Sequence, residues 1–412
     1  MRLPAALIGI ATAGLMLLTG TSTVAATLRV SGTDTGCKNA RFTSIQNAID
    51  AARPNDTIIV CAGVYDEQLV VDKQLRVRGK GGAIVRPSSM AANGITSLRT
   101  GEPIASVIAI TARVKLSGLE IDASANGLGC TVGDPNLIGV FFRGVSGSLK
   151  ESIVHGTRLG DADLSCESGA GVFVQGGTGT IKVSLLDNRI YDYQRAGIVV
   201  NETGARATIR GNIVTGLGST PELAQNGIQV GFGGFAKITQ NVVQNNTTPT
   251  EDTCTFDGGN LVFQADGGVI SGNTFTGNTA GVFILGSGNR IKKNRLNGLS
   301  GGVPAGLDGI LLAGHSNLVF RNVINDMSAT GIRVLGNGNR VTRNTVVGTR
   351  AANLCDSLST TAGCEDVLDI CGVGVRIVQG SANIVAMNTL VSNDVDVLDE
   401  ALSTKVRRIK KQ

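Results

Sequence analysis

The sequence has 412 residues and a formal net charge of +5 at neutral pH. Six cations lie near its two ends, and without them the remainder carries −1; they are Arg2, Lys405, Arg407, Arg408, Lys410 and Lys411. This balance argues against a nucleic-acid-binding protein, because phosphate binding needs a basic stripe on the folded surface. Aromatic residues make up only 3% of the chain and Trp is absent. Platforms for stacking neutral sugars are therefore scarce, and a bound polysaccharide is expected to be acidic and recognised by Arg and Lys.

The first 26 residues have the features of a secretory signal peptide. A short positive start, Met1-Arg2, precedes an apolar run over residues 5–18, and Val24-Ala25-Ala26 offers small residues for cleavage. The run is short for a membrane span, and no Cys follows it to carry a lipid. We therefore expect a secreted or cell-envelope protein without a membrane span after cleavage. A retained anchor is the alternative.

A capping segment is expected at about residues 37–56. Thr43 to Gln46 fits a capping box at the start of a short helix. One face of that helix would be apolar and consists of Ile45, Ala48, Ile49 and Ala52. The helix would plug the open end of a strand stack, where the first coil otherwise exposes its core and unpaired strand edges.

A repeat organises most of the chain after this segment. A Gly followed by an apolar residue recurs as Gly171-Val172, Gly197-Ile198, Gly227-Ile228, Gly281-Val282, Gly309-Ile310, Gly331-Ile332 and Gly374-Val375. An Asn follows each pair by 13 to 17 residues, at Asn188, Asn212, Asn241, Asn294, Asn322, Asn344 and Asn388. The shortest repeat, from Gly309 to Gly331, is 22 residues long, which is one supersecondary unit that must stack on its neighbours.

Each unit contains three short apolar stretches rather than a helical pattern. Between Gly309 and Thr330 these are residues 310–312, 318–320 and 323–324, separated by small and polar residues. Helices would need apolar residues every three or four positions over a longer run. The pattern predicts an all-β parallel β-helix with three strands per coil. The Asn of each coil would then lie at the same turn and hydrogen-bond the Asn about 4.8 Å away in the next coil, as a structural ladder.

The sequence resembles the right-handed parallel β-helix proteins of the pectin-lyase-like superfamily from about Phe42 to Val397. The Gly-Ile first strand, the single-residue Asn turn and the variable loop after the third strand carry this resemblance. The entry segment is similar to that of pectin methylesterases over Phe42-Thr43-Ser44-Ile45-Gln46, Ala51-Ala52-Arg53-Pro54, Ile58-Ile59-Val60 and Gly63-Val64-Tyr65-Asp66-Glu67. We therefore expect one β-helix domain over residues 27–400, followed by a basic, solvated tail at 401–412.

The resemblance implies a polysaccharide cleft, but no catalytic motif of the family can be transferred. The extra residues of the long coils fall on one side of the predicted first-strand sheet, in residues 125–136, 156–168, 216–226, 246–258, 299–307 and 349–369. Such loops would wall a groove. Polygalacturonase and pectin methylesterase motifs are absent, and Asp134-Pro135-Asn136 is only a fragment of the epimerase motif. Arg290-Ile291-Lys292 matches a polygalacturonase tripeptide but lies on the wrong strand.

One group of residues is suited to catalysis although it matches no motif of the family. Placing Glu151 at the ladder position before Asn188 makes His155 and Asp192 stacked neighbours at the end of the third strand. Further polar groups lie around them, and these are Arg158, Asp161, Asp163, Tyr191, Tyr193 and Arg195. A His or Tyr can remove the proton α to a uronate carboxylate, an Asp can orient the His, and an Arg can neutralise the carboxylate. The candidate catalytic residues are therefore His155, Asp192, Tyr193, Arg195 and Arg158. The alternative is a loop His bonded to a nearby Asp, with tyrosines that cover apolar coil surface.

The outward row of the first-strand sheet is expected to read Phe141, Phe173, Val199, Gln229, Phe283, Leu311, Arg333 and Arg376. It lacks the acids that a glycosidase needs. An apolar strip with two Arg residues is typical of a sheet covered by loops or by another protein. The candidate substrate-binding residues on this side are Arg143, Phe173, Gln229, Arg333 and Arg376.

Eight cysteines in an even set, without metal-binding spacing, predict disulfides in an oxidising compartment. The expected pairs are Cys37 with Cys61, Cys130 with Cys166, Cys355 with Cys364, and Cys254 with Cys371.

No cofactor is expected, although Ca²⁺ could bind the oxygen ligands of Asp356, Glu365, Asp366 and Asp369. His315 is expected in an exposed turn.

Two functions of different class follow from these observations. The first is a secreted enzyme acting on an acidic polysaccharide as a lyase or C5-epimerase, with its site at His155. The second is a non-catalytic surface β-helix that binds a glycan or a protein.

Overall fold

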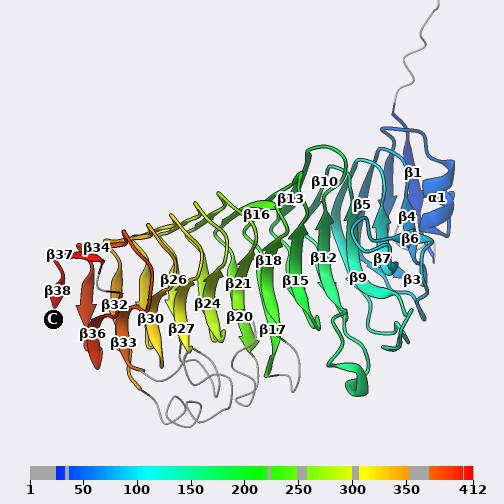
Figure 1. Ribbon diagram of the computed structural model, residues 1–412. Helices are drawn as coiled ribbons and strands as arrows, with labels where there is room; N and C mark the ends of the chain where they lie inside the picture. Colours follow the sequence, from blue (N-terminus) through cyan, green and yellow to red (C-terminus); the bar gives the residue numbers. More distant parts are fainter. Residues whose placement is uncertain are drawn as a thin grey trace, which may run out of the picture.

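The computed structural model describes residues 25–32, 37–219, 224–247, 258–298, 306–351, 371–401 and 403–411. In this part the chain winds into an elongated stack of coils, with the helix α1 at one end and the last strands at the other (Figure 1). Strands of successive coils pair in parallel, apart from one short antiparallel pair. The predicted parallel β-helix is confirmed.

The first strands of the coils form a 13-stranded sheet, here called the first-strand sheet. Its members are β4 (Leu69–Val71), β6 (Ile95–Thr96), β7 (Pro103–Ile110), β9 (Asn136–Arg143), β12 (Ala170–Gln175), β15 (Ala196–Asn201), β18 (Asn226–Gly231), β21 (Gly258–Phe263), β24 (Ala280–Ile284), β27 (Asp308–Leu312), β30 (Thr330–Val334), β33 (Val373–Ile377) and β36 (Val395–Asp399).

The second and third strands join into one 25-stranded sheet, because β5 and β8 run through the bend between them. The second-strand face consists of β1 (Thr27–Val30), β2 (Thr57–Val60), β5 (Leu75–Val85), β8 (Val114–Asp122), β10 (Gly147–Lys150), β13 (Ile181–Leu186), β16 (Ala205–Arg210), β19 (Phe235–Thr239), β22 (Val269–Ser271), β25 (Arg290–Lys292), β28 (Leu318–Phe320), β31 (Arg340–Thr342), β34 (Ile384–Ala386) and β37 (Lys405–Arg407). The third-strand face consists of the ends of β5 and β8 with β3 (Gly63–Tyr65), β11 (Ile153–His155), β14 (Arg189–Tyr191), β17 (Ile213–Ser219), β20 (Val242–Thr247), β23 (Thr274–Thr276), β26 (Arg295–Asn297), β29 (Val323–Asn325), β32 (Thr345–Val347), β35 (Thr389–Val391) and β38 (Lys410–Lys411).

The core lies inside the coils and is built from β-branched and other aliphatic side chains. In the 22-residue unit, Ile310, Val319 and Ile324 each point inward from one of its three strands and are fully buried. The Gly at the second position of the first strands from β12 to β33 lets adjacent coils approach closely. At Gly309 an added Cβ would lie 2.5 Å from the carbonyl oxygen of Gly331 and 2.7 Å from Ile324, so a larger residue would displace the next coil.

The predicted Asn ladder is present between the second and third strands. Its members are Asn188, Asn212, Asn241, Asn273, Asn294, Asn322, Asn344 and Asn388, of which Asn273 was not predicted. In the middle of the ladder, the Nδ2 of Asn294 donates to Asn322 Oδ1 at 2.9 Å and to the carbonyl of Ile270 at 3.0 Å. Its Oδ1 accepts from the backbone and side-chain nitrogens of Asn273. Each amide is therefore satisfied inside the stack, where an unpaired one would be costly.

The N-terminal end is capped by α1 (Ile45–Ala51), which buries Ile45, Ala48 and Ile49 against the first coil. The expected helix is confirmed, but its cap differs from the predicted capping box. Ser44 is the N-cap and accepts from Asn47 N. Glu67, from a later coil, accepts from the backbone nitrogens of Ile45 and Gln46 in place of a Glu or Gln of the helix itself.

The described residues of the C-terminal tail are exposed to solvent, and they also extend the stack as strands, which was not predicted. Lys405–Arg407 pairs with β34, and Lys410–Lys411 pairs with β35. These two strands continue the second- and third-strand faces by one coil. Their charged side chains remain exposed, as protected edge strands require.

Two of the predicted disulfides are confirmed, Cys37–Cys61 with a Cα–Cα distance of 5.9 Å and Cys130–Cys166 with 6.2 Å. Cys371 is also disulfide-bonded. Cys254, Cys355 and Cys364 lie outside the described residues, as do residues 1–24 of the predicted signal peptide.

No helix within the described ranges is both long and apolar enough to cross a membrane.

Interrupting the ladder should destabilise the whole stack. We expect Asn294→Ala to lower the free energy of unfolding by about 2 to 4 kcal/mol, because buried donors and acceptors on both neighbouring coils lose their partner. Urea unfolding followed by circular dichroism would measure the change. Asn325→Ala is the matched control, since this partly buried Asn makes one side-chain contact with Asn297. An equal loss in both variants would contradict a special role for the ladder.

Candidate functional site

The candidate site lies on the third-strand face, where β8, β11 and β14 end side by side. His155 is aligned with Asp122 of the preceding coil. Val154 is aligned with Ile190, which places His155 next to Tyr191 of the following coil. Side chains at these positions point outward, because their strand neighbours Ile121, Val154 and Ile190 are buried in the core.

The structure corrects the predicted neighbour of His155 by one residue. Ser152, and not Glu151, precedes Asn188 in the ladder, since the Ser152 nitrogen donates to Asn188 Oδ1. Glu151 instead adopts a positive φ of 50° just before this turn. Asp192 has a positive φ of 52° and lies beyond the end of β14. Tyr191 therefore takes the place beside His155 that was predicted for Asp192.

His155 is held by two carboxylates and an aromatic ring. Its Nε2 lies 3.2 Å from Glu120 Oε1, and its Nδ1 lies 3.7 Å from Asp122 Oδ1. The ring stacks on Tyr191 with a centroid distance of 4.9 Å and an interplanar angle of 1°. The His155 side chain is 15% exposed, so the imidazole is oriented by its surroundings and still reachable from solvent. Glu120 and Asp122 were not predicted; alignment of Glu120-Ile121-Asp122 with Ile153-Val154-His155 could have found them.

Arginine side chains complete the charge distribution at this corner. Arg86 Nη1 lies 3.7 Å from Asp122 Oδ2, and the Arg189 guanidinium lies 4.9 Å from the centre of the Tyr191 ring. Burial is the main cause that raises the pKa of Tyr191 above its ordinary value, and Arg189 partly opposes it. The Tyr191 phenol is therefore protonated at neutral pH and is suited to donate a proton.

Two predicted catalytic arginines are engaged with acids of the loops. Arg158 Nη2 lies 2.8 Å from Asp161 Oδ1, and Arg158 Nε lies 3.8 Å from Asp192 Oδ1. Arg195 Nη1 lies 3.2 Å from Glu167 Oε1. The structure thus brings Arg158 and Asp192 together at the edge of the corner, whereas Arg195 belongs to the adjacent loop.

Tyr193 is placed inside the coil and is not available as a catalytic group. Its side chain is fully buried, and its hydroxyl donates to Asn246 Oδ1 at 2.6 Å. Burial raises the pKa of Tyr193 far above its ordinary value, so the phenol stays neutral. The one-residue shift in register explains this correction, because it turns Tyr191 outward and lets Tyr193 enter the core from the following turn.

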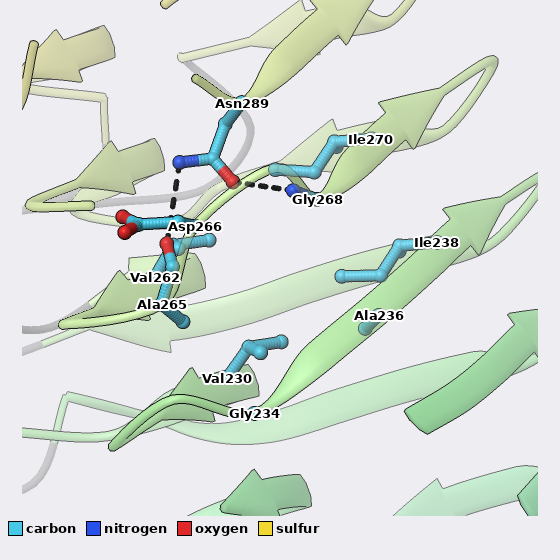
Figure 2. A pocket seen from close by; sticks show the side chains of 10 residues that line it. All are labelled: Val230, Gly234, Ala236, Ile238, Val262, Ala265, Asp266, Gly268, Ile270 and Asn289. Atoms are coloured by element: carbon cyan, nitrogen blue, oxygen red, sulfur yellow. Dashed lines mark hydrogen bonds between the residues drawn. The ribbon is translucent and has the colours of Figure 1, made fainter. Parts of the chain in front are cut away.

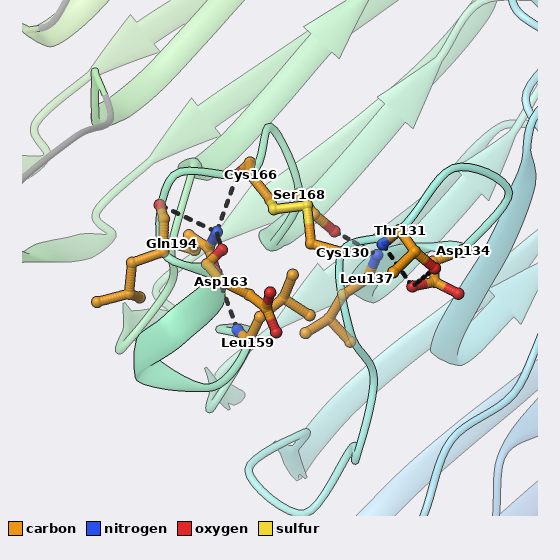
Figure 3. The surroundings of a disulfide bond; sticks show 10 residues. Cys130, Thr131, Asp134, Leu137, Leu159, Asp163, Cys166, Ser168 and Gln194 are labelled. Atoms are coloured by element: carbon orange, nitrogen blue, oxygen red, sulfur yellow. Dashed lines mark hydrogen bonds between the residues drawn. A yellow bond between two sulfur atoms is a disulfide. The ribbon is translucent and has the colours of Figure 1, made fainter.

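The Cys130–Cys166 disulfide ties together the two loops that flank this corner (Figure 3). Gln194 anchors the second loop from within, since its Nε2 donates to the carbonyls of Asp163 and Cys166 and its Oε1 accepts from Leu159 N. Thr131 and Asp134 close a turn in the first loop through a 2.7 Å hydrogen bond. Both loops are thereby held in place on the coil scaffold.

Two of the five predicted substrate-binding residues of the first-strand sheet are buried. Arg333 and Arg376 are 1% and 2% exposed, against the expectation that they bind substrate. Arg333 Nη2 lies 3.2 Å from Asp308 Oδ1, and Arg376 Nε donates to Glu400 Oε2 at 3.0 Å. Burial raises the pKa of Asp308, an effect that Arg333 opposes. Inside the protein an Arg is retained only with such a partner, which is why these side chains pair with acids.

The remaining predicted substrate-binding residues, Arg143, Phe173 and Gln229, are partly exposed. Arg143 Nε donates to the Thr96 carbonyl at 2.8 Å, and Phe173 packs on Phe141 with a centroid distance of 5.5 Å. Phe173 borders a second apolar cluster on the outside of the sheet, which consists of Ile104, Ile138, Phe141, Ala170, Ala196 and Val199. Gln229 is partly exposed in β18. The outside of the first-strand sheet thus combines buried ion pairs with a partly exposed apolar strip, and its covering by loops or by another protein stays a prediction.

A small cavity inside the coils does not provide a ligand site. It lies among Val230, Ala236, Ile238, Val262 and Ile270, with Asn289 at its rim (Figure 2). The Asn289 side chain is already bonded to Gly268 N and to the Ala265 carbonyl. With a volume of about 10 Å³ it has room for at most one water molecule.

No grouping of three or more His, Cys, Asp or Glu side chains suited to a metal ion is found within the described ranges. The four acids considered for Ca²⁺, Asp356, Glu365, Asp366 and Asp369, lie outside those ranges. His315 is exposed, and its Nδ1 accepts from Asn337 N at 2.9 Å.

Comparison with known proteins agrees with the fold. A family profile described as right handed beta helix region matches residues 138–304 and 280–404. The chain therefore belongs to the right-handed β-helix family. No curated protein sequence matches it.

Several solved structures share this architecture at low sequence identity. A GH136 lacto-N-biosidase from Eubacterium ramulus is 12% identical with a TM-score of 0.56, over 93% of this chain and 68% of that one. A double mutant of the periplasmic alginate epimerase AlgG is 16% identical with a TM-score of 0.50, over 87% and 77%. XylC in complex with xylose is 12% identical with a TM-score of 0.54, over 92% and 86%. Such identities establish the right-handed, pectin-lyase-like fold alone.

The structural role of Tyr193 can be tested directly. Tyr193→Phe should lower the free energy of unfolding by about 1 to 2 kcal/mol, because Asn246 Oδ1 loses its buried donor. Tyr191→Phe is the matched control and should change stability by less than about 0.5 kcal/mol, as for other surface substitutions. Thermal and urea unfolding would measure both. A larger loss for Tyr191→Phe than for Tyr193→Phe would contradict the assignment.

Proposed function

We propose that the protein acts on an acidic polysaccharide at the corner formed by His155, Tyr191, Glu120 and Asp122, as a lyase or a C5-epimerase. The observation that carries this proposal is the bracketing of His155 by two carboxylates while its ring stacks on an outward tyrosine. Both reactions begin with removal of the proton α to a uronate carboxylate. They need a base, a proton donor and a cation for the substrate carboxylate.

His155 is the proposed base. When its Nε2–H donates to Glu120, the lone pair of the neutral ring lies on Nδ1. A proton taken up at Nδ1 then faces Asp122 Oδ1, and the imidazolium is stabilised by a carboxylate on each side. Arg86 and the Ser124 nitrogen both contact Asp122, which keeps this carboxylate oriented.

Tyr191 is the proposed proton donor and Arg189 the proposed partner of the substrate carboxylate. In the lyase reaction the C5–H bond breaks and its proton moves to His155. The electron pair forms the C4–C5 double bond, the C4–O4 bond breaks, and O4 takes the phenolic proton of Tyr191. In the epimerase reaction the C4–O4 bond stays intact, and C5 takes the phenolic proton of Tyr191 on its opposite face. Burial raises the pKa of Tyr191 and so favours the protonated phenol, which is the proton donor in both reactions.

Related folds support a carbohydrate as the ligand class. They include a lacto-N-biosidase, an alginate epimerase and XylC in complex with xylose. An extracytoplasmic location is also supported, because the two described disulfides persist in oxidising compartments and the epimerase is periplasmic. Both inferences agree with the secretory features of residues 1–26.

The test is an assay of purified protein on a panel of polyuronates and glycosaminoglycans, with and without Ca²⁺. The ultraviolet absorbance of unsaturated ends reports lyase action, and uptake of solvent deuterium at C5 reports epimerisation. We expect His155→Ala to lower the rate at least 100-fold, which is the usual contribution of a general base. His315→Ala, a change at the exposed second histidine, should leave the rate unchanged.

Tyr191→Phe should lower the rate by roughly 10- to 100-fold with little effect on folding, since only a proton donor is lost. No product and no exchange on any polymer would overturn the catalytic proposal. Equal rates for His155→Ala and His315→Ala would show that the activity does not depend on this corner.

A further inference from the structure

The second-strand face is positively charged, although the chain without its two ends is nearly neutral. Strand alternation turns every other side chain of this face outward, while the intervening residues such as Val77, Leu116 and Ile238 are buried in the core. Parallel pairing then lines up outward residues of successive coils in straight rows, about 4.8 Å apart from strand to strand. Figure 1 shows these strands following one another along the stack.

One such row contains six cations and no acid from β5 to β37. Its cationic members are Arg76, Lys115, Lys237, Arg290, Arg340 and Lys405, all of them exposed. The residues between them in the row are Ser148, Ser184, Thr208, Val269, Leu318 and Ile384. Each position of the row is therefore either positive or uncharged, and the cations reach from one end of it to the other.

The neighbouring row, two residues further along each strand, repeats the pattern. Arg78, Lys150, Arg210, Lys292 and Arg407 occupy five of its positions, and no acid occupies the others. Lys150 pairs with Glu151, at the adjoining turn, at 2.9 Å. The cations are thus held by the scaffold, and within the described residues no acid occupies either row.

We infer that this basic face binds an acidic polysaccharide that runs along the stack. The carboxylates or sulfates of such a chain recur along an extended backbone, as the cations recur along the rows, and the Ser and Thr between them can bond sugar hydroxyls. The face differs from the His155 corner, so this inference stands whether or not the corner is catalytic.

Nucleic acid fits the face less well. A duplex carries a charge for about every 1.7 Å of its axis, far denser than these rows, and single strands bind by stacking bases on aromatic rings. Two aromatic residues, Phe235 and Phe320, lie on the face, and both rings are already covered by guanidinium groups. Arg206 lies 5.0 Å from the Phe235 centroid, and Arg321 lies 4.9 Å from that of Phe320.

The test measures binding of fluorescent polyuronate oligomers by anisotropy over a range of salt concentrations. The double variant Arg290→Gln/Arg340→Gln removes two exposed cations of the first row. Arg295→Gln/Arg350→Gln removes two exposed cations that lie outside both rows and serves as the matched control. We expect roughly fivefold weaker binding or more for the row variant, a shallower salt dependence, and little change for the control.

Three results would overturn the inference. They are equal affinities of the two double variants, equal binding of an uncharged polysaccharide, and tighter binding of single-stranded DNA or of anionic lipid vesicles than of the polyuronate at the same salt concentration. A failure of the proposed function and a failure of the basic face can be told apart. Wild-type protein that binds the polyuronate but shows no activity on it would refute the corner alone, whereas equal affinities of the two double variants would refute the face alone.

Discussion

The hydrogen bond between asparagine side chains of adjacent coils is the interaction on which the rest of the structure depends. A buried amide has two donors and two acceptor positions, and in this stack it finds partners only if the next coil presents an Asn at the same turn. The ladder therefore sets the register of the coils from Asn188 to Asn388. A shift of one residue would turn core side chains outward and leave several amides unpaired.

Once the register is set, the three outer faces acquire different chemistry. The first-strand sheet carries apolar side chains and buried ion pairs such as Arg333–Asp308. The third-strand face has the corner at His155, where acids and an aromatic ring gather around one imidazole. The second-strand face presents rows of cations. Because the scaffold is rigid, these groups keep their spacing without a ligand, which is the pre-organisation that binding and catalysis require.

Much of this could be predicted from the sequence, because the repeat is local. The repeat spacing predicted three strands per coil and the Asn turns, and a short apolar face predicted the capping helix. An even cysteine count led to two disulfides that the structure contains. The candidate site was predicted only in outline. His155 was correctly placed at the end of a third strand, but taking Glu151 for the ladder residue exchanged the places of Tyr191 and Asp192.

The sequence by itself determined the architecture, since a periodic pattern of Gly, aliphatic residues and Asn has one way to bury its apolar faces and satisfy its amides. Tertiary structure alone decided which residues meet. Asp122, His155 and Tyr191 are far apart along the chain and become neighbours only through parallel pairing. The same holds for charge: without its ends the chain sums to about −1, yet stacking gathers the cations of many coils on one face, because pairing brings together equivalent positions and not consecutive residues.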